Sequence, residues 1–336
     1  MYDWSQYKSA SCIKRYPEVI MSSEMVPYES NLTFNAGIIK EDSGYTMLFR
    51  NDYGCTQPEW EAGKRFKGTN IGLARSKDGI HWDVEPEPVL ELNKLGNPEF
   101  VRCYDPRITN MGDGRYIVSF AFDLKHGVCG AFCETHDFKD YKILYISTPD
   151  NRNMVLFPEK IGGNYVRLER PMPVYSRDGD KFDIWLSESP DLIYWGKSRL
   201  VLGTEDVPFC NDKIGPGAPP VKTDKGWLVI FHAVDRDNSR GKFGWENSWK
   251  KRYCIGIMLL DLNDPSKVIG MSKQPLLVPE ADYELHGGFR DNALFPCGMV
   301  KEGSKIRIYY SAGDAVVRMA EAEESELLAL CTESRF

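Results

Sequence analysis

Short apolar runs that alternate with polar turns recur along the whole chain. Three of these runs lead into the phrases SKDGIHW, THDFKDY and SPDLIYW, each a polar turn built on Asp and closed by an aromatic residue. The closing residues are Trp82, Tyr141 and Trp195, so the intervals between them are 59 and 54 residues. Such intervals are too long for a solenoid repeat and suit a four-stranded unit.

Two further units follow, with weaker closing turns. They comprise GAPPVKTDKGWLVIFHAVD with RYCIGIMLLDL, and ALFPCGMVKEGSKIRIYYSAGD with AVVRMAEAE. Five units in 336 residues give about 60 residues each, the size of a β-propeller blade. The pattern predicts an all-β fold, a five-bladed β-propeller in one domain over residues 1–336, with blade repeats at about 33–320. AEAEESELLALCTES at the C-terminus predicts a short helix that caps or closes the ring.

Charge and cysteine content narrow the choice of partners. The chain has 42 Lys+Arg against 49 Asp+Glu and a net charge of -7, which argues against a nucleic-acid binder. No apolar stretch resembles a signal peptide or reaches the ~20 residues of a membrane span, so we expect a cytoplasmic protein. The nine cysteines lack framework spacing, and reduced, mostly buried thiols are expected. Cys129 and Cys133 would lie roughly 13 Å apart on one strand face, too far for one metal ion or one disulfide.

A long polar loop from Asp235 to Arg252 carries Trp245 and Trp249. Long loops in compact domains tend to be functional, which favours a ligand lid or a subunit contact. The alternative is a surface loop whose tryptophans fold back onto the blade. Both interpretations stay open, and a homo-oligomer is a hypothesis only.

Candidate functional residues follow from the propeller geometry, because the innermost strands of all blades point side chains into one central funnel. Charged groups in apolar strands are costly to bury without partners, and here they recur once or twice in each unit. The candidates are Asn35, Arg50, Asp105, Arg152, Arg170, Lys213, His232, Tyr253, Asn292 and Asp314.

Each candidate alone has a plainer interpretation. Asp105 before Pro106 is most often a turn or a cap, the cations could form separate salt bridges, and His232 could be a hydrogen-bonded core histidine. Three cations converging on one funnel would instead repel each other unless an anion joined them, and Arg and Lys suit phosphate. G-x-S-x-G, H-E-x-x-H and G-x-G-x-x-G motifs are absent, and the five histidines show no metal spacing, so no metal is expected.

Taken together, the phrases resemble glycoside hydrolase family 130, the inverting β-mannoside phosphorylases. The resemblance runs from about Phe34 to Ala320 and rests on FNAG, LFRND, IGLARSKDGIHW, YDPRI, NRNMVLFPEK, LERP, SESPDLIYWG, KIGPGAPPVKTDKGWLVIFHAV, LLDLNDPSKVIG, LFPCGMV and IYYSAGD. It implies a five-bladed propeller with Asp105 as the single general acid. It also implies a phosphate clamp of Arg152, Arg170 and Lys213, with His232 and Tyr253 beside it. Sugar contacts are implied for Asn35, Arg50, Tyr104 and Asp314, and Asn292 is a further substrate-binding candidate.

These roles form a coherent chemistry. An inverting hydrolase needs an acid and a base, whereas a phosphorylase needs only the acid because phosphate arrives as the nucleophile. The resemblance therefore implies that a β-mannoside and inorganic phosphate, with no other cofactor, give α-mannose 1-phosphate and a shortened acceptor. Two alternatives stay open: an inverting β-mannosidase that uses water, and a non-catalytic propeller that binds sugars through aromatic stacking.

Some positions depart from close relatives and leave the acceptor open. Glu159 stands in FPEK where relatives have FPRK, and Ala36 stands where some have Ser. QPEWEAGKRFKGTN is longer than in some members, and Lys64, Arg65 or Lys67 could reach a sugar from it. The acceptor could be glucose or N-acetylglucosamine in a 1,4 linkage, or mannose in a 1,2 linkage, as in a β-manno-oligosaccharide.

Overall fold

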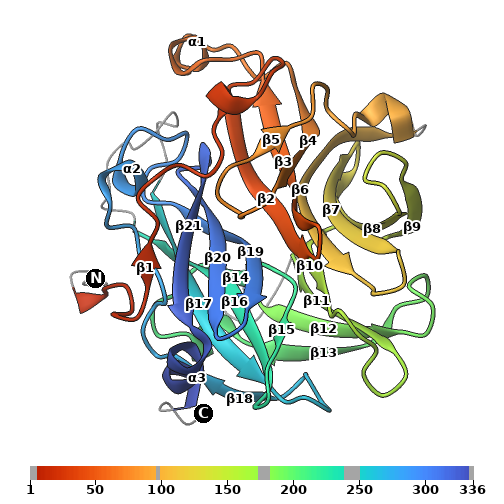
Figure 1. The fold of residues 1–336 in the computed structure, drawn as a ribbon, viewed down its shortest axis with the longest axis vertical. Helices are drawn as coiled ribbons and strands as arrows, with labels where there is room; N and C mark the ends of the chain where they lie inside the picture. The colour runs from red at the N-terminus through yellow and green to blue at the C-terminus, as the bar shows by residue number, and fades with distance from the viewer. Residues whose placement is uncertain (1–5, 96–98, 173–181, 238–249, 333–336) are drawn as a thin grey trace.

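Five antiparallel sheets surround a common axis in the computed structural model, which describes residues 6–95, 99–172, 182–237 and 250–332 (Figure 1). The innermost strands are β2, β6, β10, β14 and β19. Around that axis β2 contacts β6, β6 contacts β10, β10 contacts β14, and β19 contacts β2 and β16 of blade 4. This arrangement confirms the predicted five-bladed β-propeller. Among the residues described, no helix is long and apolar enough to cross a membrane.

Blades 1 to 3 each contain four strands that follow one another along the chain. From the axis outward they are β2 (Leu32–Glu41), β3 (Gly44–Tyr53), β4 (Gly68–Ser76) and β5 (Asp83–Val84); β6 (Phe100–Asn110), β7 (Tyr116–Leu124), β8 (Gly127–Thr135) and β9 (Lys142–Ile146); and β10 (Asn151–Leu156), β11 (Tyr165–Pro171), β12 (Ile184–Ser189) and β13 (Gly196–Leu202).

Blades 4 and 5 depart from this simple order. Blade 4 contains β14 (Lys213–Pro216), β15 (Val221–Lys222), β16 (Trp227–Arg236), β17 (Lys251–Leu260) and β18 (Val268–Met271), and blade 5 contains β19 (Leu294–Glu302), β20 (Lys305–Ala312), β21 (Val316–Glu323) and β1 (Lys14–Arg15). The helical segments are η2 (Ser23–Met25), α1 (Gln57–Glu61), η3 (Leu92–Leu95), η4 (Thr204–Asp206), α2 (Asp282–Leu285) and α3 (Glu324–Thr332).

The N-terminal segment closes the ring. β1 pairs antiparallel with β21 as the outermost strand of blade 5, and Arg15 forms an ion pair with Glu284 at 2.9 Å (Figure 1). The predicted C-terminal helix is present as α3, which packs against β17, β18 and β21 and buries Leu327 and Leu328. The helix therefore covers blades 4 and 5, and β1 performs the closure.

The recurring phrase forms the same turn in blades 1 to 3. In each turn the Asp carboxylate accepts the backbone N–H groups two and three residues later at 2.8–2.9 Å, in Asp78, Asp137 and Asp191. Asp favours such turns because its short side chain replaces a backbone acceptor. The repeat seen in the sequence is thus a repeat of local turn chemistry.

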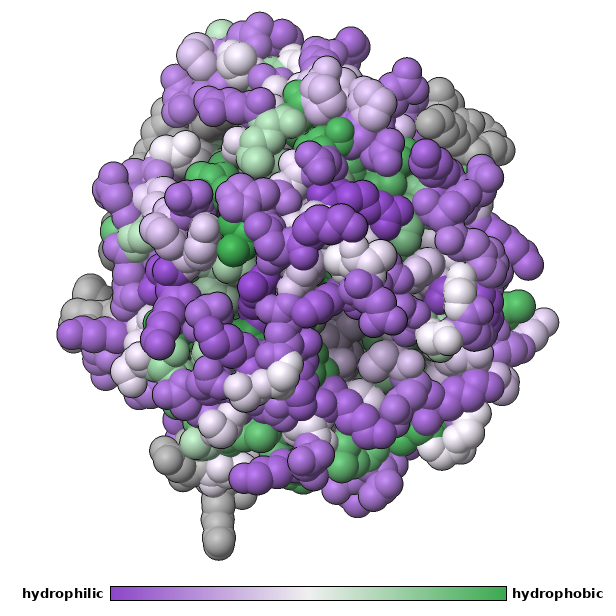
Figure 2. Space-filling model, viewed as in Figure 1, coloured by the Kyte–Doolittle hydropathy of each residue, from purple (hydrophilic) through white to green (hydrophobic). Residues whose placement is uncertain are grey.

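Apolar side chains fill the spaces between adjacent blades, while polar side chains cover the face seen in Figure 2, which is hollowed near its centre. All nine cysteines are free thiols and eight of them are buried, as expected. Cys129 and Cys133 both lie on β8.

One buried arginine connects the inner strands. Arg107 of β6 is 3% exposed and donates hydrogen bonds to the backbone carbonyls of Asn35 at 3.1 Å, Pro106 at 2.7 Å and Pro296 at 3.4 Å, and to that of Gly217. These acceptors belong to blades 1, 2 and 5 and to the segment after β14 of blade 4. A single guanidinium thus links β6 to β2, to β19 and to the segment that follows β14.

Replacing Arg107 by Met should lower the free energy of unfolding by about 4 kcal/mol or more, because four carbonyls lose their donor and each loss costs at least about 1 kcal/mol. Urea unfolding followed by tryptophan fluorescence measures the change. Arg318→Met is the matched control, since Arg318 is equally buried but donates to the carbonyl of Pro17 alone at 2.8 Å among the contacts described. Equal losses in the two variants would contradict the connecting role of Arg107.

Candidate active site

A cavity of about 270 Å³ lies where the five blades meet. Nine of the eleven residues predicted from the sequence line it, two from each of blades 1 to 4 and one from blade 5. They are Asn35, Arg50, Tyr104, Asp105, Arg152, Arg170, Lys213, Tyr253 and Asp314. The structure therefore brings together side chains that are nearly 280 residues apart in sequence, between Asn35 and Asp314.

β-Bulges turn three of the lining side chains into the cavity. The register of β2, β6 and β10 shifts at Asn35, Asp105 and Asn153, which have φ of 49°, 55° and 57°. Asn and Asp tolerate this left-handed conformation better than most residues, and bulges re-aim side chains beside active sites. Asn153 was not predicted, although its place directly after Arg152 in the NRN motif could have indicated it.

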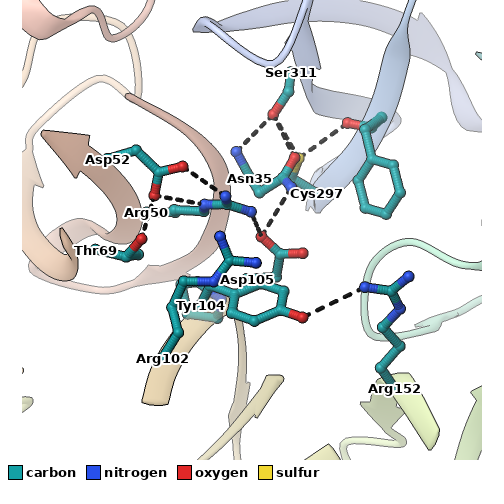
Figure 3. A network of polar contacts seen from close by, with 12 residues as sticks. Asn35, Arg50, Asp52, Thr69, Arg102, Tyr104, Asp105, Arg152, Cys297 and Ser311 are labelled. Carbon is teal, nitrogen blue, oxygen red and sulfur yellow. Dashed lines mark hydrogen bonds and ion pairs between the residues drawn. The ribbon is translucent and has the colours of Figure 1, made fainter. Parts of the chain in front are cut away.

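Asp105 is held by two donors from blade 1. Its Oδ1 accepts a hydrogen bond from Asn35 Nδ2 at 2.9 Å and one from Arg50 Nη1 at 3.4 Å (Figure 3). Both donors point at the same oxygen. Oδ2 is therefore the oxygen left for a proton.

Arg50 is fixed in turn by an ion pair that the sequence analysis missed. Its Nε and Nη2 donate to the two carboxylate oxygens of Asp52 at 3.0 and 2.6 Å, and Thr69 donates its hydroxyl to Asp52 at 2.6 Å (Figure 3). Burial disfavours the charged form of Arg50 and so lowers its pKa. The negative charges of Asp52 and Asp105 have the larger effect, and the net result is a raised pKa. Asp52 is thus occupied in a bidentate pair.

Three cations occupy blades 3 and 4. Arg152 and Arg170 are opposite each other in the β10–β11 register, and Lys213 begins β14 of the next blade. Within the part of the chain that the structure describes, none of the three forms an ion pair with a carboxylate. The buried Nε atoms of both arginines also lack a hydrogen-bond partner there. Asp212, next to Lys213, pairs with Lys251 at 2.9 Å.

Burial and mutual repulsion weaken the positive charge of this cluster. They lower the pKa of Arg170 to about 9, through burial first and then through repulsion from Arg152. They lower the pKa of Lys213 to about 6, with Arg170 and Lys251 contributing. Arg152 differs: burial lowers its pKa, but Tyr104 and Asp105 outweigh burial and raise it. An anion bound among the three would supply the missing opposite charge.

His232 lies behind Arg170 and does not line the cavity. It is fully buried, and its Nε2 accepts a hydrogen bond from Arg170 Nη1 at 3.0 Å. Burial and the nearby cations hold the pKa of His232 well below its usual range, so the imidazole is neutral. Its ring stacks on Phe295 at 4.6 Å. His232 therefore fixes the guanidinium of Arg170 from the rear.

The remaining predicted residues differ in placement. Asn292 does not line the cavity, and its backbone carbonyl accepts the N–H of Tyr253 at 2.9 Å. Asp314 lines the cavity, and burial raises its pKa against the opposing effect of Arg290 and Arg50. Tyr104 donates its hydroxyl to Asp123 at 2.8 Å. The same hydroxyl accepts a hydrogen bond from Arg152 at 3.4 Å (Figure 3). Trp245 and Trp249 lie outside the described residues.

An aromatic wall, defined as Trp60, Phe66 and Phe289, lines one side of the cavity. Its ring centroids lie 5.1–5.7 Å apart. Trp60 and Phe66 belong to the inserted segment QPEWEAGKRFKGTN, whose Lys64, Arg65 and Lys67 line a separate surface depression instead. This segment therefore contributes aromatic rings to the cavity. The sequence analysis had instead suggested that one of its cations could reach a sugar. The sequence gives no periodic signal for the wall, because its members come from two distant loops.

These features define a β-propeller whose sugar-sized cavity holds Asp105 together with a cationic cluster that has no carboxylate partner among the described residues, an arrangement suited to carbohydrate chemistry. The family model of glycoside hydrolase family 130, described as β-1,4-mannooligosaccharide phosphorylase, matches residues 11–333. The chain belongs to this family of glycoside phosphorylases. No group of three or more His, Cys, Asp or Glu side chains among the residues described could hold a metal ion.

Relatives and solved structures agree with this assignment. The chain is 35% identical to β-1,2-mannobiose phosphorylase of Listeria innocua over 263 residues, which cover 77% of this chain and 67% of the relative. It is 34% identical to β-1,4-mannooligosaccharide phosphorylase of Ruminococcus albus, covering 90% of this chain and 81% of the relative. The structure of the Listeria innocua β-1,2-mannobiose phosphorylase with β-1,2-mannobiose matches with a TM-score of 0.80 at 27% identity, covering 96% of this chain and 99% of that chain.

Proposed function

We propose that the protein is an inverting phosphorylase of β-mannosides that uses inorganic phosphate as co-substrate and no metal or other cofactor. The observation that carries the proposal is the cluster of Arg152, Arg170 and Lys213, which faces the same cavity as Asp105 without a described carboxylate partner. A buried cluster of this kind is unfavourable unless an anion joins it. Phosphate offers two negative charges and several oxygens to the arginine forks and the lysine.

In the proposed reaction, Asp105 supplies the proton that the glycosidic oxygen takes up as the bond from this oxygen to the anomeric carbon breaks. A phosphate oxygen held by the three cations forms the new bond to the anomeric carbon from the opposite face. The products are α-mannose 1-phosphate and the shortened acceptor. A second carboxylate is unnecessary because phosphate needs no activation, whereas water would need a base. Asp52 is unsuited to that task because Arg50 and Thr69 occupy its oxygens.

The acceptor sugar is proposed to stack on the aromatic wall. The flat faces of pyranose rings pack on aromatic rings, and Trp60 and Phe66 are only partly buried. Relatives that are 31–35% identical act on β-1,2-mannobiose, 1,2-β-oligomannan or β-1,4-mannooligosaccharide, which favours a β-manno-oligosaccharide substrate. The inserted segment is where the acceptor preference is set.

Replacing Arg170 by Met should raise KM for phosphate about 10- to 100-fold, since a charge-assisted hydrogen bond contributes about 1.5–3 kcal/mol. The binding of a β-mannobiose should change less than 3-fold, roughly 0.6 kcal/mol. The assay follows α-mannose 1-phosphate formed from β-mannobiose at increasing phosphate concentrations, with isothermal titration for sugar binding. Arg199→Met is the control, because Arg199 lies on β13 at the outer edge of blade 3, outside the cavity.

Three outcomes would contradict the proposed activity. Free mannose released without phosphate indicates hydrolysis. Sugar binding without any product indicates a non-catalytic propeller. An equal loss of phosphate use and sugar binding in the Arg170 variant argues against a phosphate clamp.

Anion binding should be accompanied by proton uptake. The pKa of Lys213 is lowered to about 6, so at pH 7.5 the free protein holds this lysine mostly neutral. A bound dianion favours the charged form and raises this pKa again. Affinity should therefore fall as pH rises above about 6, approaching tenfold per pH unit until the pKa of the complex is reached.

Sulfate is the suitable probe because it does not titrate near neutral pH. Calorimetric titrations at pH 7.5 in two buffers of different ionisation enthalpy give the number of protons taken up, and a value approaching one is expected. Lys213→Gln should abolish the uptake, and the exposed Lys222→Gln should retain it. Uptake that is unchanged in Lys213→Gln would refute the assignment.

Replacing Trp60 by Ala should raise KM for the acceptor about 3- to 10-fold in the synthetic direction, because one aromatic contact contributes about 0.5–1.5 kcal/mol. KM for α-mannose 1-phosphate should stay the same. Mannose, mannobiose, glucose and N-acetylglucosamine are offered as acceptors, and phosphate release is measured. Tyr194→Ala, at a side chain 74% exposed on blade 3, serves as the control. An unchanged acceptor KM would exclude stacking on Trp60.

A further inference from the structure

A buried serine lies behind the residue that contacts Asp105. Ser311 of β20 is fully buried, and its Oγ donates to Asn35 Oδ1 at 2.8 Å (Figure 3). Ser311 Oγ also accepts a hydrogen bond from the backbone N–H of Asn35 at 2.6 Å. One hydroxyl thus holds both the main chain and the side chain of Asn35.

We propose that Ser311 is a positioning residue for the reaction, which fixes the side-chain amide of Asn35 and thereby keeps the proton of Asp105 on Oδ2. The inference rests on the proposed role of Asp105 as the general acid. It assigns a function to a residue of blade 5 that does not line the cavity.

Hydrogen counting determines the direction of these bonds. A hydroxyl carries one proton and two lone pairs, and a backbone N–H can only donate. Ser311 must therefore accept from the Asn35 backbone and has its own proton left for Asn35 Oδ1 or for Cys297. The Cys297 thiol lies 3.3 Å from Ser311 Oγ and 3.0 Å from the carbonyl of Phe295, to which it can donate. The amide oxygen is the stronger acceptor, so Oδ1 of Asn35 receives the serine proton.

Once Oδ1 faces Ser311, the amide nitrogen must face the other way. There it donates to Asp105 Oδ1 at 2.9 Å, beside the contact from Arg50. A proton on that oxygen would collide with both donors. The acid form of Asp105 therefore carries its proton on Oδ2, the oxygen without a described partner.

The reverse amide orientation shows why this control matters. If the amide turned by 180°, its oxygen would face Asp105 Oδ1 and could accept a proton held there. The acid proton would then be trapped in a hydrogen bond to Asn35, away from a substrate. Ser311 disfavours this state. In the reverse orientation the amide nitrogen, not Oδ1, would face the Ser311 hydroxyl, and the hydroxyl proton would lose its acceptor.

The local backbone supports the same role. Asn35 occupies a bulge with φ of 49°, a conformation that costs energy for a residue other than glycine. A second bulge in β19 at Cys297 brings the thiol beside Ser311 and Asn35. Two inner strands are thus distorted where Ser311 contacts Asn35.

Ser311→Ala should lower kcat about 3- to 10-fold, the effect of one hydrogen bond, with KM for phosphate unchanged. The pH–rate profile should change as well, because the amide that donates to Asp105 Oδ1 is no longer held in place. Ser311→Cys conserves the volume of the side chain but provides a weaker hydrogen-bond donor, so it should show the same changes to a smaller extent. This variant also serves as the test if Ser311→Ala does not fold.

A double-mutant cycle with Asn35→Ala tests whether Ser311 acts through Asn35. In the Asn35→Ala background, Ser311→Ala should change kcat by less than 2-fold, whereas independent effects would multiply. Ser189→Ala is the matched control. Ser189 is fully buried and its hydroxyl accepts the N–H of Leu192 at 2.9 Å in a turn of blade 3, so its loss should leave kcat and the pH profile unchanged.

The outcomes separate this inference from the proposed function. An active Asp105→Asn variant would refute the proposed acid and the inference with it. If Asp105→Asn is inactive and the wild type forms α-mannose 1-phosphate, then a wild-type pH profile in Ser311→Ala overturns the inference alone. Multiplicative effects in the cycle overturn it as well.

Discussion

The hydrogen bonds of Arg107 are the constraint on which the site depends. Each blade delivers one or two side chains to the cavity, and their relative heights are set by the inner strands. By donating to carbonyls on blades 1, 2 and 5 and beside β14, Arg107 fixes those heights without an ion pair of its own among the described contacts. Its charge also adds to the positive field near His232, whose pKa it helps to lower.

The cavity combines two halves with opposite electrostatic characters. Blades 1 and 2 hold Asp105 among matched partners, where Arg50 is compensated by Asp52 and Asn35 is satisfied by Ser311. Blades 3 and 4 hold cations whose charges are uncompensated within the described residues, and the lowered pKa values of Arg170 and Lys213 are the result. The scaffold enforces this repulsion, which only an arriving anion relieves. The Tyr104 hydroxyl, 3.4 Å from Arg152 Nη1, is the contact between the halves.

The sequence reveals features whose chemistry is local and hides those created by tertiary packing. The repeat was recognisable because Asp78, Asp137 and Asp191 each build their own turn. The cations were recognisable because charge in an apolar strand is conspicuous. The closing strand β1 has only two residues and hence no pattern. Asp52 was not among the sequence candidates because nothing local to it marks its pairing with Arg50, and the aromatic wall joins segments from blades 1 and 5.

The arrangement allows acceptor chemistry and phosphate chemistry to vary independently. The aromatic wall comes largely from the segment between β3 and β4, outside the ring of inner strands, whereas Arg152, Arg170 and Lys213 lie within β10, β11 and β14. A change in that segment would leave the hydrogen bonds of Arg107 and the register of Arg152 with Arg170 untouched. Because surface loops tolerate insertions far better than paired inner strands do, a shared clamp can serve substrates with different linkages.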